Sequence, residues 1–178
     1  MKFHSLSVAG AFVIEPQRLE DERGFFARVF CHDEFVAHGL NPRVVQSSIS
    51  YNRRRGTLRG MHYQTAPHEE AKLVRCTRGR AYDVVLDLRS GSPTRGRWAA
   101  AEIGAEDQRM VYVPEGCAHG FQTLEDDTEL LYQMSEFFHP ECGAGVRWDD
   151  PAFGIAWPIA DPTISERDRG YAPYVPAC

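Results

Sequence analysis

LRGMHYQ, at residues 58–64, is the stretch that the rest of this sequence is arranged around. Residues 57–64 read as a β-strand with two different faces. In a regular strand one face would carry Leu58, Gly60, His62 and Gln64, and the other Arg59, Met61 and Tyr63. His62 then shares its face with an amide, and this face can both transfer protons and donate hydrogen bonds.

A second stretch, VPEGCAHGF at residues 113–121, also places a histidine in a strand-like run. Its Pro/Gly turn predicts a tight reversal, after which His119 enters another apolar run. A single histidine in such a run is most often a core or capping residue. Two histidines on neighbouring strands can instead share one pocket, and their pairing is the first indication of a functional site.

Short strands separated by turn signals fill most of the remaining chain. The pattern predicts strands over residues 8–14, 25–30, 43–51, 57–64, 71–77, 80–89, 97–103, 109–113, 119–124 and 128–138. It also predicts one helix over residues 32–38, closed by Gly39, and a tail from Trp148 to Arg169 that wraps the body and ends in a short helix begun by Ser165. Many short strands at this spacing indicate a sandwich or barrel, and a jelly roll fits best.

Composition indicates a single globular domain over residues 1–178. The net charge of −5 gives no general attraction for nucleic acid or an anionic membrane. Residues 1–14 hold one lysine and a broken apolar run, which is too short for a signal peptide or a membrane span. The five cysteines are widely spaced, without a CxxC pair, and are expected to be reduced thiols. These features predict a cytoplasmic location.

Four residues have the side-chain types needed to remove a proton beside a carbonyl group. His62 is a candidate base and Tyr132 a candidate acid, while Lys72 can stabilise an enolate oxygen and Asp168 can orient an imidazole. The last three also have ordinary structural explanations, as a half-buried strand tyrosine, a solvent-facing lysine and a helix-surface charge. Spacing alone leaves both interpretations open.

Arginines provide a candidate anion site. Arg23 and Arg59, with Arg167 in addition, could hold a diphosphate through bidentate hydrogen bonds. The arginine run at residues 53–55 is instead expected to be a solvated loop.

No metal is expected. PxGxxH at residues 114–119 matches the second half of the cupin metal signature, but the first half requires His-x-His and reads HYQ at residues 62–64. A transition-metal site needs three or four protein ligands. His68 and Glu69 could be enlisted, but they do not restore the missing position of the motif.

A series of motifs in this order resembles the dTDP-4-dehydrorhamnose 3,5-epimerases, and the resemblance covers nearly the whole chain. The motifs are DxRGxF at 21–26, LRGMHYQ at 58–64, AKLVRC at 71–76, DVVLDLRxGSPT at 83–94, PxGxAHGF at 114–121, WDDP at 148–151 and ISxxD at 164–168.

The resemblance implies an all-β cupin jelly roll (double-stranded β-helix), with a few short helices mainly near the C-terminus. It implies a homodimer that exchanges an N-terminal strand. The implied activity is that of an isomerase without cofactor, which inverts C3 and C5 of a small-molecule substrate, a nucleotide-linked 4-keto-6-deoxyhexose.

Roles follow residue by residue from the same resemblance. His62 would be the base and Asp168 its orienting partner, with Tyr132 as the acid on the opposite face of the sugar. The other implied contacts are Lys72 and His119 at the C4 keto oxygen, Arg23 and Arg59 at the diphosphate, and Gln46 at the nucleoside.

Several ligand positions depart from the family pattern. Arg28 replaces an acidic residue and Ser48 replaces an asparagine at positions that read thymine, and Phe138 replaces the second tyrosine of a pair. Arg167 and Gly143 replace a lysine and a glutamate. A cation now stands where a hydrogen-bond acceptor is usual, so a weak or relaxed base preference is expected, with the catalytic groups retained.

Two alternatives remain open from sequence. One keeps the reaction class but inverts a single carbon, C3 or C5, or uses a sugar on a base other than thymine. The other is a sugar-nucleotide-binding cupin without turnover. The presence of all four candidate catalytic residues argues against the binding module.

Overall fold

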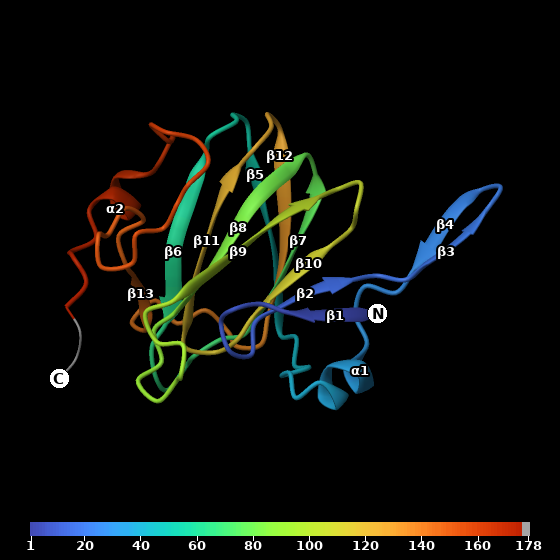
Figure 1. Cartoon of the computed structure of the whole chain (residues 1–178), viewed down its shortest axis with the longest axis horizontal. Coiled ribbons are helices and arrows are strands. Elements are labelled where there is room, and N and C mark those ends of the chain that lie inside the picture. Colours follow the sequence, from blue (N-terminus) through green and yellow to red (C-terminus); the bar gives the residue numbers. More distant parts are fainter. Residues whose placement is uncertain (176–178) are drawn as a thin grey trace.

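The computed structural model describes residues 1–175, and two antiparallel sheets face each other in it (Figure 1). The six-stranded sheet has the spatial order β1 (Lys2–Ser5), β2 (Phe12–Glu15), β10 (Met110–Val113), β7 (Lys72–Arg78), β12 (Thr128–Met134) and β5 (Gln46–Asn52). The five-stranded sheet has the order β13 (Gly143–Gly145), β6 (Leu58–Gln64), β11 (Cys117–Thr123), β8 (Arg80–Asp87) and β9 (Trp98–Gly104). The prediction of an all-β jelly roll is confirmed.

The main core lies between the sheets, where alternate residues of facing strands meet. Val74, Val85, Val111, Phe121 and Leu130 are each at most 1% exposed there. Two smaller apolar clusters cover the outer faces. Helix α1 (His32–Ala37) buries Phe35 against β2, β7 and β10, and the tail after β13 packs on the outer side of β6, β8 and β11. The tail thus wraps the body as predicted.

The second helix, α2 (Glu166–Arg169), begins where the sequence predicted. Ser165 is its N-cap, and the Ser165 hydroxyl accepts a hydrogen bond of 3.1 Å from the backbone N–H of Asp168. This cap fixes the backbone that carries the Asp168 carboxylate. Within residues 1–175, no helix is long and apolar enough to cross a membrane.

A hairpin of β3 (Arg18–Asp21) and β4 (Gly24–Ala27) projects from the body near the N-terminus (Figure 1). Its apolar side chains are not covered by the rest of the chain: Leu19 is 61% exposed and Phe26 is 70% exposed. Isolated two-stranded ribbons are marginal in water. The hairpin therefore exposes apolar side chains of a kind that folded chains usually cover.

Strand boundaries differ from the predicted ranges near the N-terminus. The predicted strand over residues 8–14 is a turn followed by β2, because Gly10 has a φ of 78° and reverses the chain so that β1 pairs with β2. The predicted strand over residues 25–30 is only the second half of the β3–β4 hairpin. Strands β1, β3 and β13 were not predicted, since each is four residues or fewer.

The predicted alternation of residues 58–64 is wrong at one point that matters for the site. His62 lies opposite His119 and Arg59 lies opposite Phe121, with a register shift between the two pairs. Residues directly opposite each other in an antiparallel pair project to the same face. Arg59 and His62 therefore share the inner face, although regular alternation separates them.

Gly60 makes this irregularity possible. Its φ is 144°, and a Cβ at this position would lie only 2.5 Å from the Cα of Gly120 on the neighbouring strand. A side chain at Gly60 is excluded by that contact, which is the usual reason for glycine at a bulge.

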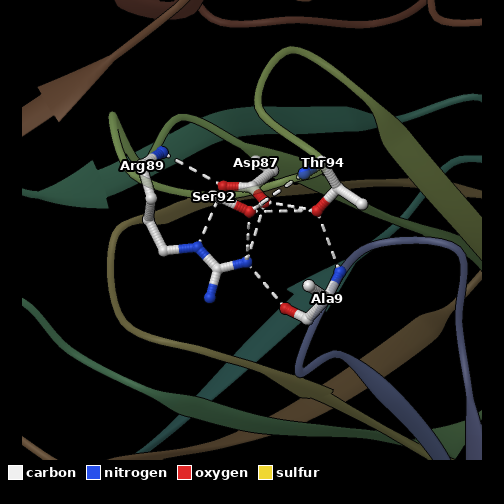
Figure 2. A network of polar contacts seen from close by, with 5 residues as sticks. All are labelled: Ala9, Asp87, Arg89, Ser92 and Thr94. Carbon is white, nitrogen blue, oxygen red and sulfur yellow. Dashed lines mark hydrogen bonds and ion pairs between the residues drawn. The ribbon is translucent and has the colours of Figure 1, made fainter.

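A buried polar network anchors the N-terminal turn to the loop after β8 (Figure 2). Asp87 is fully buried and accepts hydrogen bonds from Arg89, Ser92 and Thr94. Arg89 Nη2 also donates to the carbonyl of Ala9 at 2.6 Å, and the Ala9 N–H donates to Thr94 Oγ1 at 3.0 Å. Burial would raise the pKa of Asp87, but the hydrogen bonds from Arg89, Ser92 and Thr94 hold it far below its usual range, so the carboxylate stays ionised.

Candidate active site

His62 and Asp168 form a close pair between β6 and α2. His62 Nε2 lies 2.7 Å from Asp168 Oδ1, and the Gly60 N–H donates to the other carboxylate oxygen at 3.3 Å. Burial would raise the pKa of Asp168, but the hydrogen bond and charge of His62 outweigh it and lower the pKa. An ionised Asp168 accepts the Nε2 proton, which leaves the lone pair on Nδ1. This tautomer makes His62 suited to act as a base.

His119 forms a second imidazole–carboxylate pair one strand away. Its Nε2 lies 2.8 Å from Oδ2 of Asp83, and the side chains are 5% and 0% exposed. Oδ1 of Asp83 is buried without a hydrogen-bond partner in the described residues. Because His119 is the register partner of His62, two such pairs lie side by side on the inner face. Asp83 was not identified from the sequence.

Lys72 lies next to β6, the strand of His62, and is nearly buried. Its ammonium donates to the carbonyl of His62 at 3.2 Å and lies 3.0 Å from Oε1 of Glu70, whose side chain is 11% exposed. A buried ammonium requires such partners to stay charged. Lys72 is thus a fixed cation beside His62, and Glu70, also missed by sequence reasoning, balances its charge.

Tyr132 projects from β12 into the space between the sheets. Its ring lies 5.9 Å from the His119 ring and 6.3 Å from the Phe121 ring. Burial raises the pKa of Tyr132 well above its usual range, with the charge of Asp83 adding to the effect and Arg59 opposing it. The phenol therefore keeps its proton at neutral pH and can donate it.

Two adjoining cavities open beside these groups. One of about 420 Å³ is lined by His62, Asp168, Arg167 and Arg59, and the other, of about 410 Å³, by Arg53, Arg54 and Arg59, with Thr57 and Thr163 shared. Arg59 Nε donates to Asn52 Oδ1 at 2.8 Å, which fixes the guanidinium between the two cavities. The arginine run at residues 53–55 was expected to be solvated only, but Arg53 and Arg54 also line this cleft.

Gln46 and Ser48 lie on β5 and Phe138 follows β12, and none of the three lines either cavity. Ser48 is the register partner of Tyr132 and so projects to the same face. Gln46 Oε1 accepts a 2.6 Å hydrogen bond from the backbone N–H of Phe138, whose side chain is exposed. Because its oxygen is engaged, Gln46 presents the NH₂ group, a pure donor, to any ligand.

Arg23 and Arg28 are not brought into this cleft within one chain. Arg23 lies at the β3–β4 turn and pairs with Asp21 at 2.6 Å, with 85% of its side chain exposed. Arg28 follows the hairpin, and its Nη1 lies 3.5 Å from Glu34 Oε1. Both residues are on the projecting segment and line neither cavity.

The described residues thus bring an oriented imidazole, a protonated phenol and a buried ammonium close to β6 and β11, while Arg59 and Arg167 line the cavity beside His62. This set can remove a proton from carbon beside a carbonyl, stabilise the resulting enolate and return a proton. The arginines suit a phosphate ester of the substrate.

The family model described as dTDP-4-dehydrorhamnose 3,5-epimerase matches residues 5–174. A protein of that name from Sinorhizobium fredii is 43% identical over 169 residues, which is 94% of this chain and 87% of the relative. The chain is thus similar to this relative over most of its length.

Solved structures that match this chain are also epimerases of nucleotide-linked sugars. The crystal structure of dTDP-4-dehydrorhamnose 3,5-epimerase from Elizabethkingia anophelis matches with a TM-score of 0.95 and 37% identity, covering 98% of this chain and 96% of that one. The structure of ChmJ, a 3'-monoepimerase from Streptomyces bikiniensis in complex with dTDP-quinovose, matches with a TM-score of 0.87 and 38% identity, covering 96% and 86%.

Proposed function

The chain belongs to the dTDP-4-dehydrorhamnose 3,5-epimerase family, and we propose that it inverts C3 and C5 of a dTDP-linked 4-keto-6-deoxyhexose through an enolate. It is an isomerase. The observation that carries the proposal is the His62–Asp168 pair on a cleft shared with Arg59. A ketone at C4 acidifies both neighbouring C–H bonds, so the protein needs to supply only a base, an acid and a cation.

In this proposal His62 removes the proton through Nδ1, and Asp168 stabilises the imidazolium that forms. Lys72 and His119 lie at the developing enolate oxygen. Tyr132 returns a proton from the opposite face. Each inversion leaves His62 protonated and Tyr132 deprotonated, and exchange of protons with solvent restores both groups. Because the reaction is redox-neutral, the scheme requires no redox cofactor.

Arg59 is proposed to hold the diphosphate, with Arg167 near the sugar end of the cleft and Gln46 donating to the nucleoside. Arg59 already has its Nε hydrogen-bonded to Asn52, so the remaining guanidinium donors stay available for phosphate oxygens. Ser48, the register partner of Tyr132, and Phe138, whose backbone N–H bonds Gln46, are proposed to lie beside the nucleoside.

We also propose a homodimer with an exchanged N-terminal segment. Within one chain β1 pairs with β2, and the β3–β4 hairpin is the part that projects with exposed Leu19 and Phe26. Insertion of this hairpin into a second copy would bury that apolar surface and would bring Arg23 to the partner's cleft. Sedimentation equilibrium should give the mass of two chains, and a monomer mass would contradict the exchange.

A cytoplasmic location belongs to the same proposal. Four cysteines in the described residues, Cys31, Cys76, Cys117 and Cys142, are free thiols, which suits a reducing compartment. Cys178 lies outside the described residues.

Solvent deuterium tests the function. When dTDP-4-keto-6-deoxyglucose is incubated with the enzyme in D₂O, we expect deuterium at both C3 and C5 of the product, measured by NMR, together with inversion at both centres. Each incorporated deuteron reports one removal and return of a proton. Binding of the nucleotide sugar without any exchange would leave only the non-catalytic cupin.

A single-centre epimerase is the second candidate, favoured by the 38% identity to a 3'-monoepimerase. The deuterium experiment separates the two, because label and inversion at one carbon alone would support it. Both candidates use the same base and acid, so residue variants do not distinguish them.

We expect the preference of this protein for thymine to be weak. Arg28 stands where the family has an acidic residue, and a guanidinium cannot accept the imide N–H of thymine. Loss of a charge-assisted hydrogen bond of about 1.5–3 kcal/mol weakens thymidine recognition roughly tenfold to a hundredfold. Calorimetric titration with dTDP, UDP, CDP and GDP should therefore show dTDP preferred by less than about a hundredfold.

The Arg28–Glu34 ion pair is the structural feature that could make this prediction fail. If Arg28 keeps that contact when nucleotide binds, the base preference of the family persists, and dTDP is favoured by more than a hundredfold. Arg28→Glu should restore an acceptor and increase the preference for dTDP. Arg55→Glu, on the exposed loop before β6, is the matched charge control and should not change the ratio.

A further inference from the structure

A cluster of three potential metal ligands lies outside the catalytic groups. His68 follows β6, and Glu136 and His139 follow β12, so loops from the two sheets meet at one end of the sandwich. One ligand atom from each residue lies within 4.8 Å of the others. Two imidazoles and a carboxylate are the ligand types that Zn²⁺, Co²⁺, Ni²⁺ and Cu²⁺ prefer, whereas Mg²⁺ and Ca²⁺ prefer oxygen alone.

Gln64 holds the backbones that carry these ligands. Its side chain is 2% exposed, and its Nε2 donates to the carbonyls of His68 at 2.9 Å and Phe137 at 3.1 Å. Its Oε1 accepts from the backbone N–H of His139 at 2.7 Å. One buried amide thus ties both ligand-bearing loops together, so their backbones are ordered before any ion binds, which is what a metal site requires of its support.

The carboxylate of the cluster is also fixed in position. Glu136 accepts hydrogen bonds of 2.8 Å from the Phe137 N–H and from Arg43. Each carboxylate oxygen has a second lone pair, so these donors leave acceptor capacity for an ion.

The two imidazoles are stacked, with ring centroids 3.5 Å apart and planes inclined by 12°. A metal lies in the plane of each ring that binds it. One imidazole must therefore turn about its χ2 to close the site. A tetrahedral site with Zn–N bonds of about 2.0–2.1 Å places its ligand atoms roughly 3.4 Å apart, closer than the 4.8 Å within which they now lie.

We propose that His68, Glu136 and His139 form a binding site for a divalent transition-metal ion such as Zn²⁺, separate from the His62 and His119 pairs. Glu141, whose Oε1 lies 3.3 Å from His139 Nδ1, or a water molecule completes the coordination. The bound ion would restrict the motion of the segment from Glu136 to His139, which carries Phe138. The inference does not depend on the proposed reaction.

Metal titration of the full chain tests the proposal. With ZnCl₂ and no chelator, calorimetry should show one equivalent bound per chain, and MgCl₂ should show none. His68→Ala and His139→Ala should each weaken Zn²⁺ binding about tenfold or more. His4→Ala is the matched control, because His4 lies beside Glu15 at 3.5 Å on the opposite edge of the fold and should leave the titration unchanged.

Three results would overturn the site: no Zn²⁺ uptake by the intact protein, unchanged uptake in both cluster variants, or uptake lost in His62→Ala and His119→Ala but retained in His68→Ala. Far-UV circular dichroism checks that each variant folds. A measurement on the intact protein removes the dependence on variants: the EPR spectrum of bound Cu²⁺ should show coupling to two imidazole nitrogens, and coupling to none would reject the assignment.

Discussion

Replacing His62 by asparagine should lower the rate of C–H exchange at C3 and C5 by about a thousandfold or more. His62 is the imidazole whose Nε2 is held by Asp168, and within residues 1–175 no protein group bonds its Nδ1. Asparagine has a comparable size and polarity but no lone pair of useful basicity. Deuterium incorporation from D₂O, followed by NMR at each carbon, measures the effect directly.

Binding separates loss of chemistry from loss of the site. The arginines that line the cleft do not contact His62 through a hydrogen bond, so His62→Asn should retain affinity for dTDP. His32→Asn is a matched control, since His32 Nδ1 also lies 3.1 Å from an aspartate, Asp33, but on an exposed helix. Near-normal exchange in His62→Asn would contradict the assignment of the base.

Asp168→Asn should reduce exchange less than His62→Asn does. The imidazole remains in place, but the amide no longer stabilises the imidazolium and can favour the wrong tautomer. Because Asp168 is 4% exposed, the uncharged amide is also easier to bury than the carboxylate, so the fold should tolerate this change.

The resemblance and strand pattern predicted the fold class, α1, the Ser165 cap and the wrapping tail, because each depends on local sequence. The common face of Arg59 and His62 was not predictable in this way. It depends on the contact between Gly60 and Gly120, which lie on different strands, and a one-position irregularity reverses which residues share a face.

The sequence analysis did not identify the carboxylates of Glu70 and Asp83, which pair with Lys72 and His119, for a related reason. Glu70 precedes Lys72 in a charged loop and reads as a solvated residue, and only the fold buries the pair. Asp83 did leave a signal, since a charged residue within the apolar run of β8 must find a partner when buried. The position of Arg23 on the β3–β4 hairpin and of Arg28 just after it, outside both cavities, depends on how the hairpin lies relative to the two sheets, which no local pattern encodes.

Tyr132→Phe should separate proton removal from inversion. His62 can still remove and return a proton on its own face, so deuterium should still enter C3 and C5, but with retention of configuration. Net inversion should fall by about a hundredfold or more, because the phenylalanine ring cannot donate a proton to the opposite face. Mass spectrometry of recovered substrate measures the label, and NMR coupling constants measure the configuration.

The position of Tyr132 makes this variant conservative for the fold. Its ring packs against Phe121 and His119, and phenylalanine keeps those contacts while removing only the hydroxyl. Tyr82→Phe is the matched control, because Tyr82 packs against Trp157 in the outer apolar cluster, lines neither cavity, and should alter neither label nor configuration. The raised pKa of Tyr132 adds a further requirement: the phenol stays protonated through neutral pH, so inversion should not decline as the pH rises toward 9 through loss of this proton. Inversion at the wild-type rate in Tyr132→Phe would assign the second proton to another group, and His119, beside the same ring, would be the first to test.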